Sequence, residues 1–153
     1  MAEKALVGII MGSKSDLPVM GACTEQLEEF GVPFEMIIAS AHRAPDRVHE
    51  WAAGARERGL KVIIAAAGKA AHLAGVVAAF TSLPIVGVPM KTSDLGGMDS
   101  LLSMVQMPSG VPVACVAIGG AKNAAIYATQ ILATTDPEYA RVIEDFKRNM
   151  AEG

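Results

Sequence analysis

The sequence has few charged residues, few cysteines and no long apolar run. Only 19% of its 153 residues are charged, whereas 52% are hydrophobic, and a monomer of this size has a large surface to cover with polar groups. We therefore expect part of the apolar surface to be buried between subunits. The formal net charge of −3 argues against nucleic acid or an anionic membrane as the main partner.

The scarcity of cysteine and of apolar runs also bears on where the protein works. Cys23 and Cys115 lie in apolar surroundings without metal-ligand spacing, so buried thiols in a reducing compartment explain them best. The apolar segments are shorter than the roughly 18 residues of a membrane span, and the first residues do not resemble a signal peptide. We expect a soluble, cytoplasmic protein.

Apolar runs and helical periodicities alternate along the chain. The runs lack polar alternation, as in strands covered on both faces, and they span residues 5–11, 34–38, 62–66, 85–88 and 113–118. Helical spacing predicts helices at residues 17–30, 45–58, 70–80, 98–105, 123–133 and 137–150. Short loops between alternating elements favour parallel strands with helices on both faces. The sequence therefore predicts one three-layer αβα domain over residues 1–153, flavodoxin-like, with a five-stranded parallel sheet and a C-terminal amphipathic helix.

The loop after the first strand is the first candidate for ligand binding. Ser13 and Ser15 offer hydroxyls beside the N-terminus of a helix, where free N–H groups favour a phosphate. Asp16 suits hydrogen bonds from ribose hydroxyls, as acidic residues do in nucleotide-binding folds. In the alternative interpretation, Ser15 or Asp16 only caps the helix.

The segment Ser40-Ala41-His42-Arg43 follows the second strand and precedes a helix that begins at Pro45. Such turns gather at the carboxyl edge of an open α/β sheet, where ligands bind. Arg43 beside free helix N–H groups favours an anion, and His42 favours proton transfer near neutral pH. Alternatively, the turn lies on the surface and both side chains are merely solvated.

Two further loops are expected at the same edge. The segment around Gly68 has small residues that let a flat ligand lie against the backbone, and His72 follows it at the start of an apolar helix. A satisfied core histidine is the common alternative at such a position. Residues 90–99 form a polar loop that we expect to be a wall of the pocket, and His49 is expected to be a helix-surface residue.

Several kinds of site find no support in the sequence. It has no persuasive Ser-His-Asp order, metal-ligand cluster or cysteine nucleophile, and the first loop lacks the Gly-x-x-x-x-Gly-Lys-Ser/Thr pattern of an ATP site. What remains is affinity for phosphate and hydroxyl groups together with one imidazole. These features suit a small phosphorylated ribose substrate and proton transfer without a cofactor or metal.

Four ordered blocks together resemble the N5-carboxyaminoimidazole ribonucleotide mutase family of bacterial purine biosynthesis. They are Met11-Gly12-Ser13-Lys14-Ser15-Asp16, Ser40-Ala41-His42-Arg43-Ala44-Pro45-Asp46, Ala70-Ala71-His72-Leu73 with Gly75, and residues 100–108, Ser-Leu-Leu-Ser-Met-Val-Gln-Met-Pro. The resemblance covers nearly the whole chain. The related direct carboxylases, which use aminoimidazole ribonucleotide and CO2, typically read Ser-Ala-His-Lys and lack the second histidine.

The resemblance implies an isomerase that moves a carboxylate from the exocyclic nitrogen of an aminoimidazole ribonucleotide to ring carbon 4. The carbamate would lose CO2 in a closed pocket and carbon 4 would recapture it, with His42 as the catalytic proton carrier. The implied substrate-binding residues are Ser15, Ser40 and Arg43 for the 5′-phosphate, Asp16 for the ribose, and Ser13, Gly68 and His72 for the base and carboxylate. Leu73 is implied as a further substrate-binding residue.

The resemblance also implies a homo-octamer with sites at subunit boundaries. Many members of the family read Gly-Gly-Ala-Ala-His where this chain has Lys69 as the second residue. That lysine either faces solvent or adds positive charge near the carboxylate. A direct carboxylase and a non-catalytic phosphoribosyl- or flavin-binding module remain the alternative functions.

Overall fold

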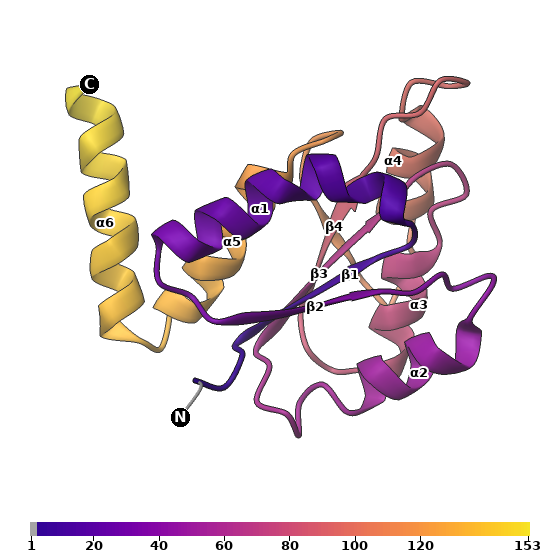
Figure 1. Cartoon of the computed structure of the whole chain (residues 1–153), viewed down its shortest axis with the longest axis horizontal. Helices are drawn as coiled ribbons and strands as arrows, with labels where there is room; N and C mark the ends of the chain where they lie inside the picture. Colours follow the sequence, from indigo (N-terminus) through magenta and orange to yellow (C-terminus); the bar gives the residue numbers. More distant parts are fainter. Residues whose placement is uncertain (1–2) are drawn as a thin grey trace.

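The computed structural model describes residues 3–153, and within them the chain forms a five-stranded parallel sheet flanked by helices (Figure 1). The strands are β1 (Val7–Met11), β2 (Phe34–Ile38), β3 (Val62–Ala67), β4 (Ile85–Pro89) and β5 (Ala114–Cys115). The helices are the short 3₁₀ helix η1 (Lys14–Asp16) and α1 (Leu17–Glu29), α2 (Pro45–Ala53), α3 (Leu73–Phe80), α4 (Met98–Val105), α5 (Ala121–Ala133) and α6 (Pro137–Glu152). The predicted fold class is confirmed.

The strands are arranged in the order β2-β1-β3-β4-β5. The chain adds β2 on one side of β1 and then adds β3, β4 and β5 on the other side, so the sequence order of the strands reverses between β1 and β3. Ile9 is paired with Met36 of β2 on one side and with Ile64 of β3 on the other. In sheets of this topology ligands bind outside the carboxyl ends of the strands at that reversal. The loops that follow β1, β2 and β3 meet there. Among residues 3–153, no helix is long and apolar enough to cross a membrane.

Alternate residues of the buried strands face two separate cores. Val7, Ile9 and Met11 point toward α1 and α5, whereas Ile10 points toward α2 and α3. Figure 1 shows α1 and α5 on one side of the sheet and α2 and α3 on the other. Because both faces are covered, β1 and β3 are buried along their whole length, which explains their continuous apolar sequence.

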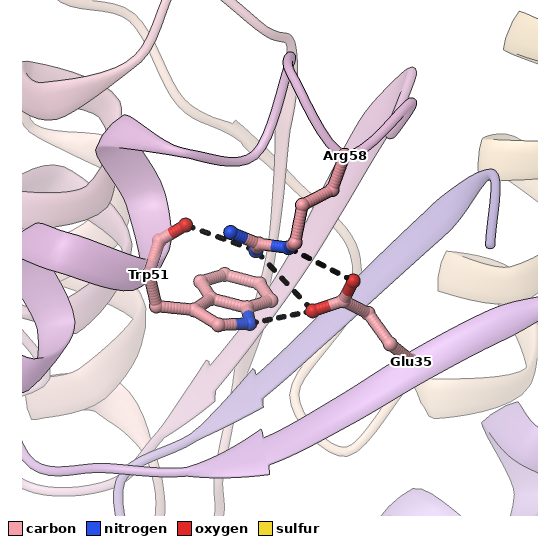
Figure 2. A network of polar contacts seen from close by, with 3 residues as sticks. All are labelled: Glu35, Trp51 and Arg58. Atoms are coloured by element: carbon pink, nitrogen blue, oxygen red, sulfur yellow. Dashed lines mark hydrogen bonds and ion pairs between the residues drawn. The ribbon is translucent and has the colours of Figure 1, made fainter. Parts of the chain in front are cut away.

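A polar network joins β2 to the segment that follows α2 (Figure 2). The Arg58 Nε–H donates to Glu35 Oε1 at 3.1 Å and its Nη2 donates to Glu35 Oε2 and to the carbonyl of Trp51. The Trp51 indole N–H donates to Glu35 Oε2 at 2.7 Å. A Cβ on Gly8 would lie 2.9 Å from the Trp51 ring, so only glycine lets the indole lie against β1.

Three elements differ from the sequence-based prediction by three residues or more at one end. Helix α2 ends at Ala53 rather than at residue 58, because the chain turns at Gly54 and Arg58 is drawn toward Glu35. Helix α3 begins at Leu73 rather than at residue 70, because the turn at residues 69–72 has its own short hydrogen bonds. Strand β5 is confined to Ala114–Cys115, at the edge of the sheet, where pairing is available on one side only.

The outer helices leave apolar residues exposed in the single chain. Helix α6 packs against α5, with Tyr139 and Ile143 buried and Phe146 edge-on to Phe30 at 5.3 Å between ring centroids. Helix α4 exposes Met98, Leu102 and Val105, each about half accessible. These three residues are spaced four and three apart and therefore share one face of the helix.

Candidate active site

Ser13 shapes the loop between β1 and α1. Its side-chain oxygen lies 3.2 Å from the backbone N–H of Ser15 and 2.9 Å from the Ser15 hydroxyl. Ser13 is thereby the N-cap of η1, and Pro18 occupies the first turn of α1, where a missing N–H costs nothing. The alternative interpretation, in which Ser15 or Asp16 caps the helix, is thus wrong: the capping side chain is that of Ser13, and within the described chain the side chain of Asp16 makes no capping hydrogen bond to α1.

Ser40 shapes the loop between β2 and α2 in the same manner. Its side-chain oxygen accepts the backbone N–H groups of His42 and Arg43, both at 3.2 Å. The Arg43 Nη2 reaches the Gly12 carbonyl of the neighbouring loop at 3.5 Å. Both loops are therefore folded locally by a serine and brought together by an arginine, with His42 and Arg43 exposed at the carboxyl edge.

A cavity of about 340 Å³ lies between these loops. Within the described part of the chain, it is lined by all the predicted site residues except His72: Ser13, Ser15, Asp16, Ser40, His42, Arg43, Gly68 and Leu73. Its volume is at the lower end of the range for small-molecule sites. The structure therefore brings together predicted site residues from three separate stretches of sequence, while their individual roles remain predictions.

Asp16 is a carboxylate at the base of the cavity with only 8% of its surface exposed. Burial raises its pKa above the ordinary value, and a hydrogen bond from the Ser13 backbone offsets part of that rise. It is the N-cap residue of α1, yet among residues 3–153 its side chain makes no capping hydrogen bond. A buried carboxylate that does not cap its helix is free to accept hydrogen bonds from ligand hydroxyls.

His42 and His72 are in direct contact. His42 Nε2 lies 2.9 Å from His72 Nδ1, and the two rings meet nearly edge-on, with an interplanar angle of 79°. His72 is the N-cap residue of α3 and is exposed rather than buried in the core. The structure therefore contradicts the core-histidine interpretation of His72. His49, by contrast, lies on the surface of α2 against Phe80, as predicted.

Sequence reasoning missed a contact across the mouth of the cavity. Lys69 Nζ lies 2.9 Å from Asp94 Oδ2, in the loop between β4 and α4. Thr92 of the same loop lines the cavity, which agrees with the predicted pocket wall. The departure of Lys69 from the family pattern was the signal, but its partner 25 residues away follows only from the fold.

The site offers hydroxyls, a guanidinium, a carboxylate and an imidazole pair. In residues 3–153 no group of three or more His, Cys, Asp or Glu side chains is placed to hold a metal ion. The side chains present can bind a phosphate, accept hydrogen bonds from a sugar and exchange a proton with a bound substrate.

Several known proteins are similar to this chain. The N5-carboxyaminoimidazole ribonucleotide mutase of Thermotoga maritima is 61% identical over 144 residues, which are 94% of this chain and 84% of the relative. The phosphoribosylaminoimidazole carboxylase of Saccharomyces cerevisiae is 58% identical over 143 residues, 94% of this chain but only 25% of the yeast protein. A crystal structure of Treponema denticola PurE superposes with a TM-score of 0.87 at 29% identity, covering 97% of this chain and 92% of the other.

The match to a protein family spans nearly the whole chain. Residues 6–153 match the family described as AIR carboxylase, and this range includes every strand, every helix and every predicted site residue. The protein is therefore a member of the AIR carboxylase family.

Proposed function

We propose that this protein converts N5-carboxyaminoimidazole ribonucleotide to 4-carboxy-5-aminoimidazole ribonucleotide in purine biosynthesis, as an isomerase that needs no cofactor. The observation that carries the proposal is the position of His42, whose imidazole lines a cavity shared with two serine loops, Arg43 and Asp16. The mutase names of relatives that match over most of their length support the same activity.

The reaction divides into two proton transfers at His42. In the first, protonated His42 donates a proton to the exocyclic nitrogen, the nitrogen–carboxyl bond breaks, and CO2 is released within the cavity. In the second, ring carbon 4 attacks the CO2 carbon, and the proton that carbon 4 loses returns to His42. Atoms and charge balance, and CO2 held beside the ring reacts with an effective concentration that bulk water cannot provide.

The remaining side chains anchor the ribonucleotide. Ser15, Ser40 and Arg43 bind the 5′-phosphate, because hydroxyls and a guanidinium at helix N-termini suit a dianion. Asp16 accepts hydrogen bonds from the ribose hydroxyls. Ser13, Gly68, His72 and Leu73 hold the base and the migrating carboxylate. His72 takes part while it is in contact with His42.

Direct carboxylation of aminoimidazole ribonucleotide by CO2 is the second candidate, and the names of the fungal relatives favour it. This chain corresponds to only a quarter of the yeast protein, so that name describes a protein most of which has no counterpart here. The mutases match over most of their own length, 84% for the Thermotoga maritima enzyme. The mutase reaction is therefore the better supported of the two.

Supplying each substrate to the purified protein separates the two reactions. We expect formation of 4-carboxy-5-aminoimidazole ribonucleotide from the carbamate without added bicarbonate, and turnover only with aminoimidazole ribonucleotide plus bicarbonate would reject the mutase. His42→Asn should abolish turnover and leave substrate affinity within about tenfold, because shape is kept and proton transfer is lost. His49→Asn, on the surface of α2, is the matched control and should be as active as the wild type.

We also propose a cytoplasmic homo-octamer. The exposed apolar face of α4 at Met98, Leu102 and Val105, together with the hydrophobic composition, supports burial between copies of the chain. Two free cysteines support a reducing compartment. Light scattering should give the mass of eight chains at micromolar concentration, and a monomer would contradict the proposal.

A further inference from the structure

Lys69 has an unusual backbone conformation at the edge of the cavity. Its φ is 55°, a left-handed value that it shares with glycines but with no other described residue. Residues other than glycine rarely adopt this backbone conformation, and strained positions of this kind cluster at functional sites. A lysine at this position therefore costs backbone energy. We look for a compensating interaction among the contacts of its side chain.

The side chain of Lys69 spans two loops that line the cavity. Its ammonium lies 2.9 Å from the Asp94 carboxylate, and each side chain is 66% exposed. One residue earlier, a Cβ on Gly68 would lie 2.9 Å from Thr92 Cγ2. The loop between β4 and α4, residues 90–97, thus meets the loop after β3 at two points: within the cavity at Gly68 and Thr92, and at its outer rim at Lys69 and Asp94.

The charges around Lys69 keep this contact in place at neutral pH. The hydrogen bond and charge of Asp94 raise the pKa of Lys69, and Asp99 adds a smaller effect of the same sign. An exposed ion pair adds little to global stability, but it shifts the opening of a single loop by about 1.4- to 5-fold. Gly96 and Gly97, the last two residues of this loop, both have positive φ, a conformation that glycine adopts without strain.

We propose that Lys69 is a positioning residue whose ion pair with Asp94 holds the 90–97 loop against the cavity, so that CO2 released there is recaptured rather than lost to solvent. The inference rests on the proposed mutase function, and Lys69 takes no part in bond making. When the loop opens before carbon 4 attacks, CO2 leaves and aminoimidazole ribonucleotide remains as the by-product. Lys69 therefore affects how much of the released CO2 is recaptured and how much escapes, and it does not affect the bond-making steps.

Two measurements on the full-length protein test this inference. The first is deuterium uptake by peptides covering residues 90–97 without substrate. The second is turnover of carbamate labelled in its carboxylate, in unlabelled bicarbonate, with retained label and free aminoimidazole ribonucleotide as readouts. We expect Lys69→Met and Asp94→Asn each to raise loop exchange and by-product about two- to fivefold. Lys91→Met, at an exposed lysine of the same loop, is the control and should change neither.

Exchanging the two charges provides a rescue. The double variant Lys69→Asp with Asp94→Lys restores an ion pair, and aspartate tolerates the left-handed backbone, so label retention should return toward that of the wild type. Unchanged loop exchange in Lys69→Met overturns the proposal. A higher KM in Lys69→Met but not in Asp94→Asn, with label retention unchanged, overturns it in favour of direct contact between Lys69 and a substrate anion. Absence of turnover by the wild type rejects the proposed function instead, and deuterium uptake still decides whether the pair holds the loop.

Discussion

His42 and His72 share one hydrogen between Nε2 and Nδ1, at 2.9 Å. A neutral imidazole has one N–H donor and one acceptor, so one ring of the pair must donate and the other must accept. If both rings were protonated, two N–H groups would face each other and the contact would break. The pair thus holds at most one excess proton in this geometry, and His72 fixes which nitrogen of His42 is available to the substrate.

Replacing His72 by asparagine tests this arrangement. We expect kcat to fall, because His42 loses the partner that selects its tautomer, but by less than the roughly 10²- to 10⁴-fold loss on removing a direct proton donor. Steady-state kinetics would measure this loss. A variant with the kcat of the wild type would show that His72 has no influence on His42.

Asp16→Asn should stabilise the free protein and weaken binding. Burial raises the pKa of Asp16, so its charged form opposes folding at neutral pH, and removing that charge should raise Tm. Replacing one carboxylate oxygen by an NH2 donor should raise KM if, as we propose, the Asp16 carboxylate accepts hydrogen bonds from the ribose hydroxyls. Differential scanning fluorimetry and kinetics give the two quantities. A lower Tm in the variant would contradict the account of Asp16 as an ionised group held at a cost.

The raised pKa of Asp16 also leads us to expect that substrate affinity depends on pH. A raised pKa means that Asp16 takes up its proton at a higher pH than an exposed aspartate as the solution is acidified. Substrate affinity should therefore fall on acidification through that range in the wild type. In Asp16→Asn this component should be absent, which isothermal titration calorimetry at several pH values can test.

Glu35→Gln should destabilise the fold without touching the cavity. The change removes the charge that pairs with Arg58 and accepts the Trp51 N–H, and we expect a loss of about 1–2 kcal/mol in the free energy of unfolding. The matched control is Arg148→Met, which breaks an exposed pair with Asp145 on α6 and should cost almost nothing. Urea unfolding measures both. Equal losses in the two variants would mean that the network shown in Figure 2 has no special weight.

Cys23 should be inert toward thiol reagents in the native protein. It is fully buried on the inner face of α1, and burial raises its pKa to about 12, so the thiolate that such reagents require is scarce in mildly alkaline solution. Cys115 is only half-buried, so the expectation of two buried thiols is wrong for it. Peptide mapping after brief alkylation, with a denatured sample as the reference, should leave Cys23 unmodified. Rapid modification of Cys23 would reveal local opening of α1.

The fold was predictable because its signals are local. The uninterrupted apolar sequences of β1 and β3 follow from burial on both faces, and the alternation of strands and helices then determines the layers. Boundaries failed where tertiary contacts decide them: Arg58 is drawn out of the helical path by Glu35, and neither residue indicates this alone. The length of the edge strand β5 was overestimated, because an apolar sequence does not indicate that the strand pairs on one side only.

The candidate site was predictable to the extent that topology converts sequence order into proximity. The residues after β1, β2 and β3 had to meet at one edge of the sheet, so Ser13, Ser40 and Gly68 line one cavity. The contact of His42 with His72 and that of Lys69 with Asp94 depend on side-chain directions within irregular loops. Such directions are set by individual turns, and no periodicity in the sequence encodes them.

The two hydrogen bonds that the Ser40 side chain accepts limit how it can contact a ligand. Its oxygen uses both lone pairs on backbone N–H groups of its own turn, so the only hydrogen-bonding capacity left is the hydroxyl proton. That proton must point outward, and it suits an anion and disfavours a cation. In the proposed function the same oxygen thus both folds the loop and favours an anionic ligand, so Ser40→Ala should disturb the loop's shape and phosphate binding together.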